Sequence, residues 1–446
     1  MDDAIRQLDD TLVSRYRSDT GLFEELKEQQ IALGITHEGR PICPFLRPYF
    51  IGGRKYSEIR SAAASIYGAF ERLASSALSE PSIAAKLGLT EKEERWARLE
   101  PGYRGISVNS RLDTFLNPHG FKFLEYNGEN PAGVGDQPSL TSLFRRIKEV
   151  DEFLQRHEHH HPEPHRSLLR GLDSAYREFG GKTEKPGIAI VDWQGVATGA
   201  EFEILQEFFE SEGYRSRICH PDELEYDGST LRAEDFEIDI FYKRVIIHEF
   251  LERYDETHPL YRACEDGNVC MANSFRSKIP HKKSSFAVLS DPAFRHLFTP
   301  QQISAIENHI PWTRVVEPSA TDFDGERRDL LELLRAERER FVLKPNDDYG
   351  GHGIVLGWEA GESEWDDAIS RALESPYVVQ ERVDVEKTDI PMVVDGEATM
   401  ANLLVDFDPF LFNGEVEGGM VRLSAASLVN ITQGGGETGL VVLSDM

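Results

Sequence analysis

Residues 121–133 read Phe-Lys-Phe-Leu-Glu-Tyr-Asn-Gly-Glu-Asn-Pro-Ala-Gly, and together with Arg111-Leu-Asp113 they decide the fold. The turn sequence Asn117-Pro-His-Gly separates the two stretches, so we predict two short strands joined by a tight loop. Side chains alternate between the two faces of a strand, so Glu125 and Asn127 share a face. The predicted faces are Phe121, Phe123, Glu125 and Asn127 on one side and Lys122, Leu124 and Tyr126 on the other.

These two strands carry a candidate metal site. Carboxylates at Asp113 and Glu125, with the carboxamide of Asn127, offer the hard oxygen ligands that Mg²⁺ prefers, and phosphate and water oxygens would complete its shell. Arg111 is expected to face the same pocket. The alternative is a solvated hairpin that carries ordinary surface acids.

A glycine-rich hairpin later in the chain is a candidate phosphate site. Lys344-Pro-Asn-Asp-Asp-Tyr-Gly-Gly-His-Gly follows an apolar strand and leads into another at Ile354. Gly350, Gly351 and Gly353 permit positive φ, so backbone N–H groups can approach phosphate oxygens while Lys344 supplies a positive charge. A Walker A sequence is absent here. The alternative is a glycine-rich turn with an exposed lysine.

Two further segments are candidates for ligand contact. Tyr377-Val-Val-Gln-Glu-Arg-Val is an apolar strand that ends in Gln380 and Glu381, and it can offer a purine an apolar face with polar groups at the edge. Gly418-Gly-Met-Val-Arg422 is followed by Asn430-Ile-Thr-Gln-Gly-Gly-Gly436. Three consecutive glycines are costly to order, which favours a loop or lid over a ligand; a flexible surface hairpin is the alternative.

Composition limits the classes of function. The chain has 446 residues, enough for about three domains, and its 78 acidic against 49 basic residues give a formal charge of −29. Such a charge repels nucleic acids and anionic lipid, so anionic ligands require local positive groups. Four scattered cysteines indicate no disulfide framework. The sequence shows no secretory signal or membrane span, and a cytoplasmic protein is expected.

The texture of the sequence predicts five sections. They are a mainly helical section at 1–100, a section at 101–150 with the two strands of the candidate metal site, a helical connector with a His-rich loop at 151–184, a Rossmann-like α/β subdomain at 185–273, and an α+β region at 274–446 that carries the candidate phosphate hairpin. Strands alternating with helices in the fourth section predict a parallel sheet, although it lacks a G-x-G-x-x-G turn. The histidines near 156–165 offer a metal-binding alternative, but a solvated connector is the better interpretation.

The motifs together resemble the ATP-grasp superfamily, in its circularly permuted branch that includes glutathionylspermidine-synthase-like proteins. In ordinary members the Glu-x-Asn metal strand comes last, whereas here Glu125-Tyr-Asn127 precedes the other motifs. The resemblance covers about residues 100–446 and implies an α+β, α/β ATP-grasp fold. It departs from its relatives at Asp408-Pro-Phe410, where they often carry Arg-Pro-Phe, and at the acids Asp347 and Asp348.

The resemblance also implies residue roles. Lys283, with Lys282 as a rival, would be the early nucleotide-binding lysine, and Lys344 the second. Arg422 would approach the phosphates or the reacting acyl group, and Arg111 the oxyanion. The remaining implied nucleotide contacts are Gly350, Gly351, Gly353, Gln380, Glu381, Gln433, Gly434 and Gly435.

The implied reaction is an ATP- and Mg²⁺-dependent ligation of a small-molecule or peptide carboxylate to an amine. It passes through an acylphosphate and releases ADP and phosphate. A small-molecule kinase and a non-catalytic ATP-binding protein are the alternatives, and neither nucleic acid nor a membrane is an expected partner.

Overall fold

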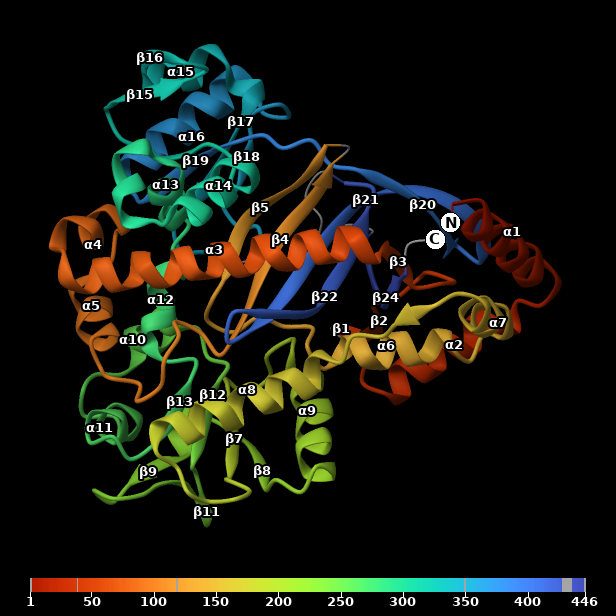
Figure 1. Cartoon of the computed structure of the whole chain (residues 1–446), viewed down its shortest axis with the longest axis horizontal. Coiled ribbons are helices and arrows are strands. Elements are labelled where there is room, and N and C mark those ends of the chain that lie inside the picture. The colour runs from red at the N-terminus through yellow and green to blue at the C-terminus, as the bar shows by residue number, and fades with distance from the viewer. Residues whose placement is uncertain (1, 38, 118, 349, 427–434, 445–446) are drawn as a thin grey trace.

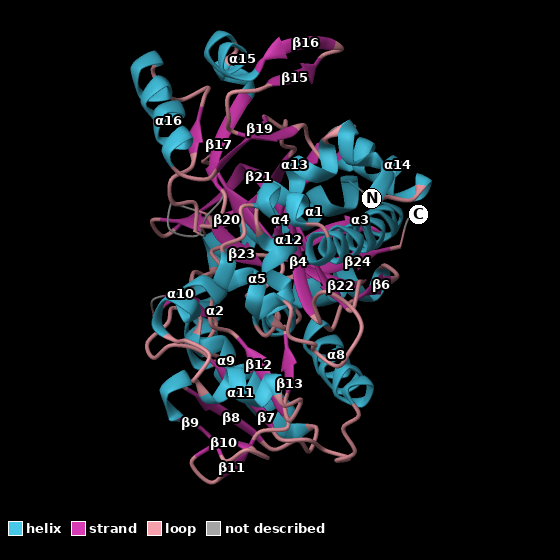
Figure 2. Cartoon of the chain, turned by 90° about the vertical axis from the view of Figure 1, so that its left-hand side faces the viewer, coloured by secondary structure: helices cyan, strands magenta, loops and turns pink. Residues whose placement is uncertain are grey.

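The computed structural model describes all residues except 1, 38, 118, 349, 427–434 and 445–446. Three parts are stacked along the molecule (Figure 1), and they stay separate in the turned view of Figure 2. A central antiparallel sheet lies between an upper lobe, which carries the glycine-rich hairpin, and a lower lobe built on a parallel sheet. Within the described residues, no helix combines the length and apolar character needed to cross a bilayer.

The central sheet has six strands in the order β23-β22-β21-β4-β5, and β20 also pairs with β21. The two predicted strands near residue 120 are its β4 and β5, and their register places Asp113 opposite Glu125 and Arg111 opposite Asn127. The strand bounds are β4 Asn109–Asn117, β5 Gly120–Asn127, β20 Lys387–Val394, β21 Glu397–Phe412, β22 Glu415–Ser424 and β23 Gly436–Thr438.

The predicted alternation along β5 is wrong at one point. The β4–β5 register shifts between Asp113 and Thr114, because Asp113 pairs with Glu125 while Thr114 pairs with Phe123, which leaves Leu124 as an extra residue. This β-bulge returns Tyr126 to the face of Phe121 and Phe123, and all three lie in the same buried cluster. Glu125 and Asn127 still share a face, but it is the face opposite the phenylalanines.

Long helix α3 (Gly53–Ser79) covers one face of this sheet (Figure 1). Its apolar residues at three- and four-residue spacing are buried, as the sequence predicts. Phe70 of this helix contacts Tyr126 with ring centroids 4.4 Å apart, and Tyr56 contacts Phe407 of β21. Because side chains alternate, Asp406 and Asp408 of β21 lie on the opposite face together with Glu125 and Asn127.

Further elements of the N-terminal region complete this layer. Strand β24 pairs in parallel with β3 and antiparallel with β6, which ties the front of the chain to its end. The bounds are α1 Asp2–Ser18, α2 Gly21–Ala32, β1 Thr36–His37, β2 Arg40–Pro41, β3 Tyr49–Gly52, α4 Pro81–Leu87, α5 Glu91–Ala97, α6 Asp136–Phe144, α7 Lys148–Arg156, β6 His159–His160 and β24 Leu440–Leu443.

The upper lobe contains a four-stranded antiparallel sheet in the order β14-β19-β17-β18. Strands β17 and β18 are joined by the glycine-rich hairpin, and helices α15 and α16 pack on this sheet around Trp365. The bounds are α13 Ser284–Ser290, α14 Pro300–His309, β14 Thr313–Val315, β15 Ala320–Phe323, β16 Glu326–Asp329, α15 Leu330–Ala336, β17 Phe341–Pro345, β18 Val355–Leu356, α16 Glu362–Glu374 and β19 Tyr377–Glu381. Helix α12 (Lys278–His281), which precedes this lobe in the chain, lies below α3 in Figure 1.

The lower lobe contains a four-stranded sheet in the order β13-β12-β7-β8, and every pairing in it is parallel. Strands alternate with helices here, in agreement with the pattern read from the sequence. A smaller sheet, β11-β10-β9, lies at its outer end. The bounds are α8 Pro164–Phe179, β7 Ile188–Val191, α9 Gly199–Ser211, β8 Ser216–Cys219, β9 Leu224–Tyr226, β10 Leu231–Ala233, β11 Phe236–Glu237, β12 Ile240–Lys243, α10 Ile247–Arg253, α11 Pro259–Glu265 and β13 Cys270–Ala272.

A glycine in the upper lobe makes its packing testable. A Cβ at position 357 would overlap the backbone carbonyl of Arg338 and lie 2.8 Å from Phe341 O. Gly357→Ala is therefore expected to lower the free energy of unfolding by about 3 kcal/mol, measured by urea denaturation. Gly361→Ala is the matched control in the same lobe, because a Cβ there meets nothing within 4 Å. Equal stability of the two variants would contradict this packing.

Candidate active site

A row of charged and polar side chains crosses the central sheet on the face away from α3. It draws on five neighbouring strands, and every member lies on a described strand. In strand order it contains Glu125 and Asn127 (β5), Asp113 and Arg111 (β4), Asp406 and Asp408 (β21), Arg422 (β22) and Glu437 (β23).

Asp113 lies at the centre of the predicted metal ligands in this row. Its Oδ1 accepts hydrogen bonds from Arg111 Nε at 3.0 Å and from Asn127 Nδ2 at 2.7 Å, and its Oδ2 accepts one from Arg422 Nη2 at 3.2 Å. Burial opposes ionisation of this carboxyl, but the two arginines prevail and lower the pKa of Asp113. The predicted residues Arg111, Asp113 and Asn127 are thus in direct contact.

Two carboxyls that the sequence analysis did not assign to the site hold Arg422. Its Nη2 lies 2.6 Å from Asp406 Oδ2 and 2.8 Å from Asp408 Oδ2. Burial and the neighbouring acids raise the pKa values of both aspartates. The sequence could have indicated these two aspartates, because Asp406-Phe-Asp408 places two carboxylates on one face of a strand. In the described residues the Nε of Arg422 is buried and has no hydrogen-bond partner, so this guanidinium keeps a donor for an anionic group.

Glu437 ends the row beyond Arg422, its register partner on β22. Gln137 Nε2 donates a hydrogen bond to Glu437 Oε1 at 2.8 Å. Burial raises the pKa of Glu437 to about 7. The glutamate comes directly after the glycine-rich segment, and no pattern in the sequence marked it as a site residue.

Lys344 lies near the end of β17, at the junction of the upper lobe and the central sheet. Its Nζ donates to Gln380 Oε1 at 2.8 Å and lies 3.4 Å from Leu124 O on β5. The side chain is buried, and burial lowers the pKa of Lys344 to about 8, although Glu125 opposes this shift. The structure therefore brings the hairpin lysine next to the predicted metal strand, more than 200 residues away in the chain.

The two rival lysines differ clearly in their partners. Lys283 Nζ lies 3.0 Å from Glu125 Oε1 and donates to Asp348 O at 2.6 Å. Lys282 Nζ instead lies 2.8 Å from Glu93 Oε1 and 2.6 Å from Asp347 Oδ2. Of the two lysines, Lys283 is the one that contacts a predicted metal ligand, Glu125.

The glycine-rich hairpin has the backbone that its sequence predicts. Gly350, Gly351 and Gly353 have φ values of 66°, 78° and 70°, which side chains with a Cβ rarely adopt. All three are exposed, whereas Asn346 at the root of the hairpin is buried. Asn346 Oδ1 accepts a hydrogen bond from Ser284 N at 2.8 Å, so the root is fixed to α13 and the tip projects outward.

The predicted adenine strand supplies contacts of two kinds. Gln380 is buried, and besides accepting from Lys344 it donates to Thr313 Oγ1 at 3.1 Å. It therefore orients the lysine. The carboxylate of Glu381 accepts from Arg340 Nη2 at 3.0 Å at a half-exposed position.

The predicted lid falls largely outside the described residues, since Gln433 and Gly434 belong to the segment 427–434. Gly435 is described and half-buried, and Gly436 begins strand β23, where it pairs with Leu423. The described end of the triple glycine is thus part of the sheet.

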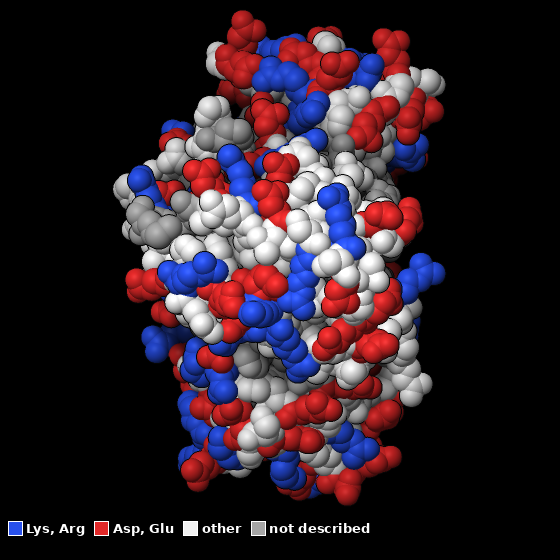
Figure 3. Space-filling view, turned by 90° about the vertical axis from the view of Figure 1, so that its right-hand side faces the viewer, with Lys and Arg blue, Asp and Glu red and all other residues white. Residues whose placement is uncertain are grey.

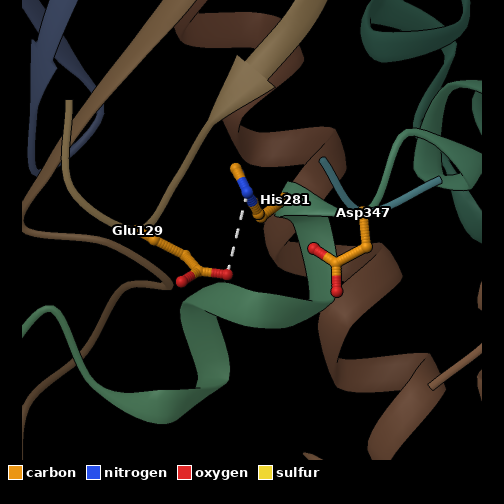
Figure 4. A group of neighbouring side chains, drawn as sticks. All are labelled: Glu129, His281 and Asp347. Carbon is orange, nitrogen blue, oxygen red and sulfur yellow. Dashed lines mark ion pairs between the residues drawn. The ribbon is translucent and has the colours of Figure 1, made fainter. Parts of the chain in front are cut away.

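A second cluster of potential metal ligands lies beside the hairpin root (Figure 4). Oxygen and nitrogen atoms of Glu129, His281 and Asp347 lie within 4.8 Å of one another. The ammonium of Lys278 is already between the two carboxylates, 3.0 Å from Glu129 Oε1 and 2.6 Å from Asp347 Oδ1. Burial opposes ionisation of Glu129, but the nearby ammonium of Lys278 outweighs this effect and lowers the pKa of Glu129 to about 2. This cluster is a buried ion-pair network in which a lysine supplies the positive charge.

The His-rich loop does not form a comparable cluster. Among the described residues, the Glu129 group alone gathers three ligands of this type. His159 Nδ1 and His157 O are 2.9 Å apart, and His160 Nε2 lies 3.4 Å from Glu417. Burial lowers the pKa of His161 to about 4. These contacts join the segment to its neighbours, and its interpretation as a connector stays a prediction.

The donor set of the charged row fits Mg²⁺ and a triphosphate. Carboxylate and amide oxygens are gathered between lysines on one side and arginines on the other, and a guanidinium donor is left over. On the surface, by contrast, Asp and Glu are spread among Lys and Arg over the face drawn in Figure 3. The row itself gathers positive groups suited to an anion, within a chain of net charge −29.

No protein-family model matches the chain. The chain is 25% identical over 353 residues to an uncharacterized protein of Mycobacterium bovis, covering 73% of this chain and 58% of the relative. An uncharacterized protein of Mycobacterium leprae matches at the same identity, with 73% and 57% covered. The chain therefore spans less than two thirds of the length of these relatives.

Solved structures give the fold. A glutathione synthetase-like effector from Globodera pallida superposes with a TM-score of 0.58 at 14% identity, covering 94% of this chain and 96% of that chain. A predicted gamma-glutamylcysteine synthetase from Methylobacillus flagellatus reaches 0.40 at 12% identity, with 78% and 84% covered. The first likeness shows that the chain shares its mixed α+β fold with this glutathione synthetase-like effector.

Proposed function

We propose that this chain is an ATP- and Mg²⁺-dependent carboxylate–amine ligase. The observation that carries the proposal is the row on the central sheet. There the predicted metal ligands of β4 and β5 lie between two lysines and two arginines. The fold shared with a glutathione synthetase-like protein supports it. We assign the chain to the circularly permuted ATP-grasp type, on the glutathionylspermidine-synthase-like branch, because its Glu-x-Asn strand precedes the other motifs.

In this proposal the residues on the upper-lobe side bind ATP. Lys283 and Lys344 hold the triphosphate, and the hairpin of Gly350, Gly351 and Gly353 covers it with N–H donors. Gln380, Glu381 and the segment Gln433–Gly435 complete the nucleotide site. Asp113, Glu125 and Asn127 would hold Mg²⁺, which would supply countercharge to the phosphates when bound.

The arginines act on the reacting groups. A carboxylate oxygen of the first substrate attacks the γ-phosphorus of ATP, ADP leaves, and an acylphosphate forms. The amine then attacks the acyl carbon to form a tetrahedral intermediate, which collapses to the amide as phosphate leaves and the nitrogen loses a proton. Arg111 stabilises the oxyanion of the tetrahedral intermediate and Arg422 the transferred phosphoryl group, contributions of about 3 kcal/mol for each donor.

We extend the proposal to the organisation of the chain. The helical section 1–100 and the Rossmann-like lobe 185–273 flank the ATP-grasp parts at 101–150 and 274–446, with the connector 151–184 between them. The parallel sheet of the lower lobe supports this assignment of a Rossmann-like lobe. The substrates are a small-molecule or peptide carboxylate and an amine, and the reaction takes place in the cytoplasm.

Nucleotide binding is the first test. At a concentration one hundred times its dissociation constant, Mg-ATP is expected to raise the melting temperature by about 3 °C or more, and ATP with excess EDTA by much less. An unchanged melting temperature with Mg-ATP would contradict the proposal. For a protein that binds Mg-ATP, ADP and phosphate release across a panel of acids and amines then separates the alternatives. A ligase releases both products, a kinase releases ADP without phosphate, and a binding protein releases neither.

A further inference from the structure

The pairing between β21 and β4 is interrupted beside the arginines. Asp406 pairs with Phe115 and Phe410 pairs with Arg111, and both pairs belong to the same register. Between them, residues 407–409 of the described β21 have no partner on β4. Pro409 in this gap carries no N–H. The gap lies where Asp113 and both arginines meet.

Asp408 fills the gap with its side chain. Its Oδ1 accepts a hydrogen bond from the backbone N–H of Thr114 at 3.0 Å. Its Oδ2 accepts one from Arg422 Nη2 at 2.8 Å and lies 3.6 Å from Arg111 Nε. The side chain is fully buried. One carboxyl therefore joins the strand that carries Asp113 to both guanidinium groups.

We infer that Asp408 is a positioning residue that sets the places of Arg422 and Arg111 at the γ-phosphate end of the proposed site. This inference rests on the proposed function. Three carboxyls tie down the Nη2 end of Arg422, while its buried Nε has no partner among the described residues. An arginine fixed at one end in this way offers its remaining donors in one orientation, and displacing donors by about 1 Å costs much of their effect.

Asp408→Asn separates positioning from structural support. An asparagine keeps Oδ1 as the acceptor for Thr114 N–H, so the strand contact survives. Its Nδ2 replaces Oδ2, however, and this places a donor against the N–H donors of the arginines. The argument holds for either protonation state of Asp408, because a carboxyl oxygen can accept from Arg422 and an NH₂ group cannot.

Binding of Mg-AMP-PCP and Mg-ADP, measured by calorimetry, tests the inference without any acceptor substrate. The two nucleotides differ at the γ-phosphate, where the arginines are proposed to act. Asp408→Asn is expected to weaken Mg-AMP-PCP binding by about tenfold or more and to leave Mg-ADP binding within about twofold of wild type. Its melting temperature is expected to stay close to wild type.

Two further variants complete the test. Asp408→Ala also strands the buried Thr114 N–H, so it should lower the melting temperature, and the asparagine variant should restore it. The matched control is Asp406→Asn. Of the two arginines, Asp406 contacts Arg422, so this variant should weaken Mg-AMP-PCP binding less than Asp408→Asn does. Wild-type nucleotide preference in Asp408→Asn, or an equal loss in Asp406→Asn, would overturn the inference. A wild-type protein that binds neither nucleotide would instead refute the proposed function, and this role with it.

Discussion

Glu125→Gln is expected to lower the rate of ADP release at least about a thousandfold, equal to about 4 kcal/mol of transition-state stabilisation. Glutamine keeps the shape of the side chain but removes the negative charge opposite Asp113. The row would then hold a divalent cation with one carboxylate instead of two. Glu125 is also the carboxylate partner of Lys283, at 3.0 Å, so the substitution leaves that ammonium without its countercharge.

The fold should survive this substitution, because the Glu125 side chain is partly exposed and the glutamine oxygen can still accept from Lys283. Mn²⁺ binding in the presence of ADP, followed by electron paramagnetic resonance, should weaken in parallel with turnover. Glu415→Gln is the control, since Glu415 is exposed on β22 and outside the row. Wild-type turnover in Glu125→Gln would remove Glu125 from the proposed metal site.

The local chemistry of the site could be predicted from sequence because it rests on short spacings. Arg111-x-Asp113 and Glu125-x-Asn127 each place two functional side chains on one face of a strand, and this period-two rule needs no tertiary information. The glycines at 350, 351 and 353 likewise marked a backbone with positive φ, and the structure has it. The roles of these residues in binding and catalysis remain predictions.

Other features of the fold and the site depend on contacts between distant segments, which the spacing of residues in the sequence does not reveal. The bulge at Leu124 reversed the expected faces of the phenylalanines, because an extra residue in one strand is defined by its partner and not by its own sequence. The choice between Lys282 and Lys283 depended on which ammonium reaches Glu125 across more than 150 residues of chain. The contribution of Asp408 depended on a gap in the pairing of β21 with β4, which no local pattern reveals.

The net charge of the chain explains why the cationic side chains of the proposed site are buried. A net charge of −29 disfavours the approach of a polyanion, so affinity for a triphosphate must come from groups whose field is not screened by water. Lys283, Lys344 and Arg111 are all buried, and each has an acidic or polar partner in the described structure. Those partners contact the cationic groups directly, so the groups are held in place before an anion binds.

Lys344→Met is expected to weaken Mg-ATP binding by about a hundredfold, equal to about 3 kcal/mol, measured by calorimetry at pH 7. Methionine keeps most of the buried stem and removes the ammonium that donates to Gln380. Lys387→Met, at an exposed position on β20, is the matched control and should bind like wild type.

The pH dependence of binding gives this prediction a sharper form. Burial lowers the pKa of Lys344 to about 8, so the free protein loses this charge as the pH rises through that value. A bound triphosphate favours the ammonium and raises its pKa, so binding takes up a proton above pH 8. Wild-type affinity for Mg-ATP should therefore fall between pH 8 and pH 9, whereas the affinity of Lys344→Met should change much less over the same interval. Parallel pH profiles would show that a different group carries the titration, and Lys344 would then lose its proposed contact with the phosphates.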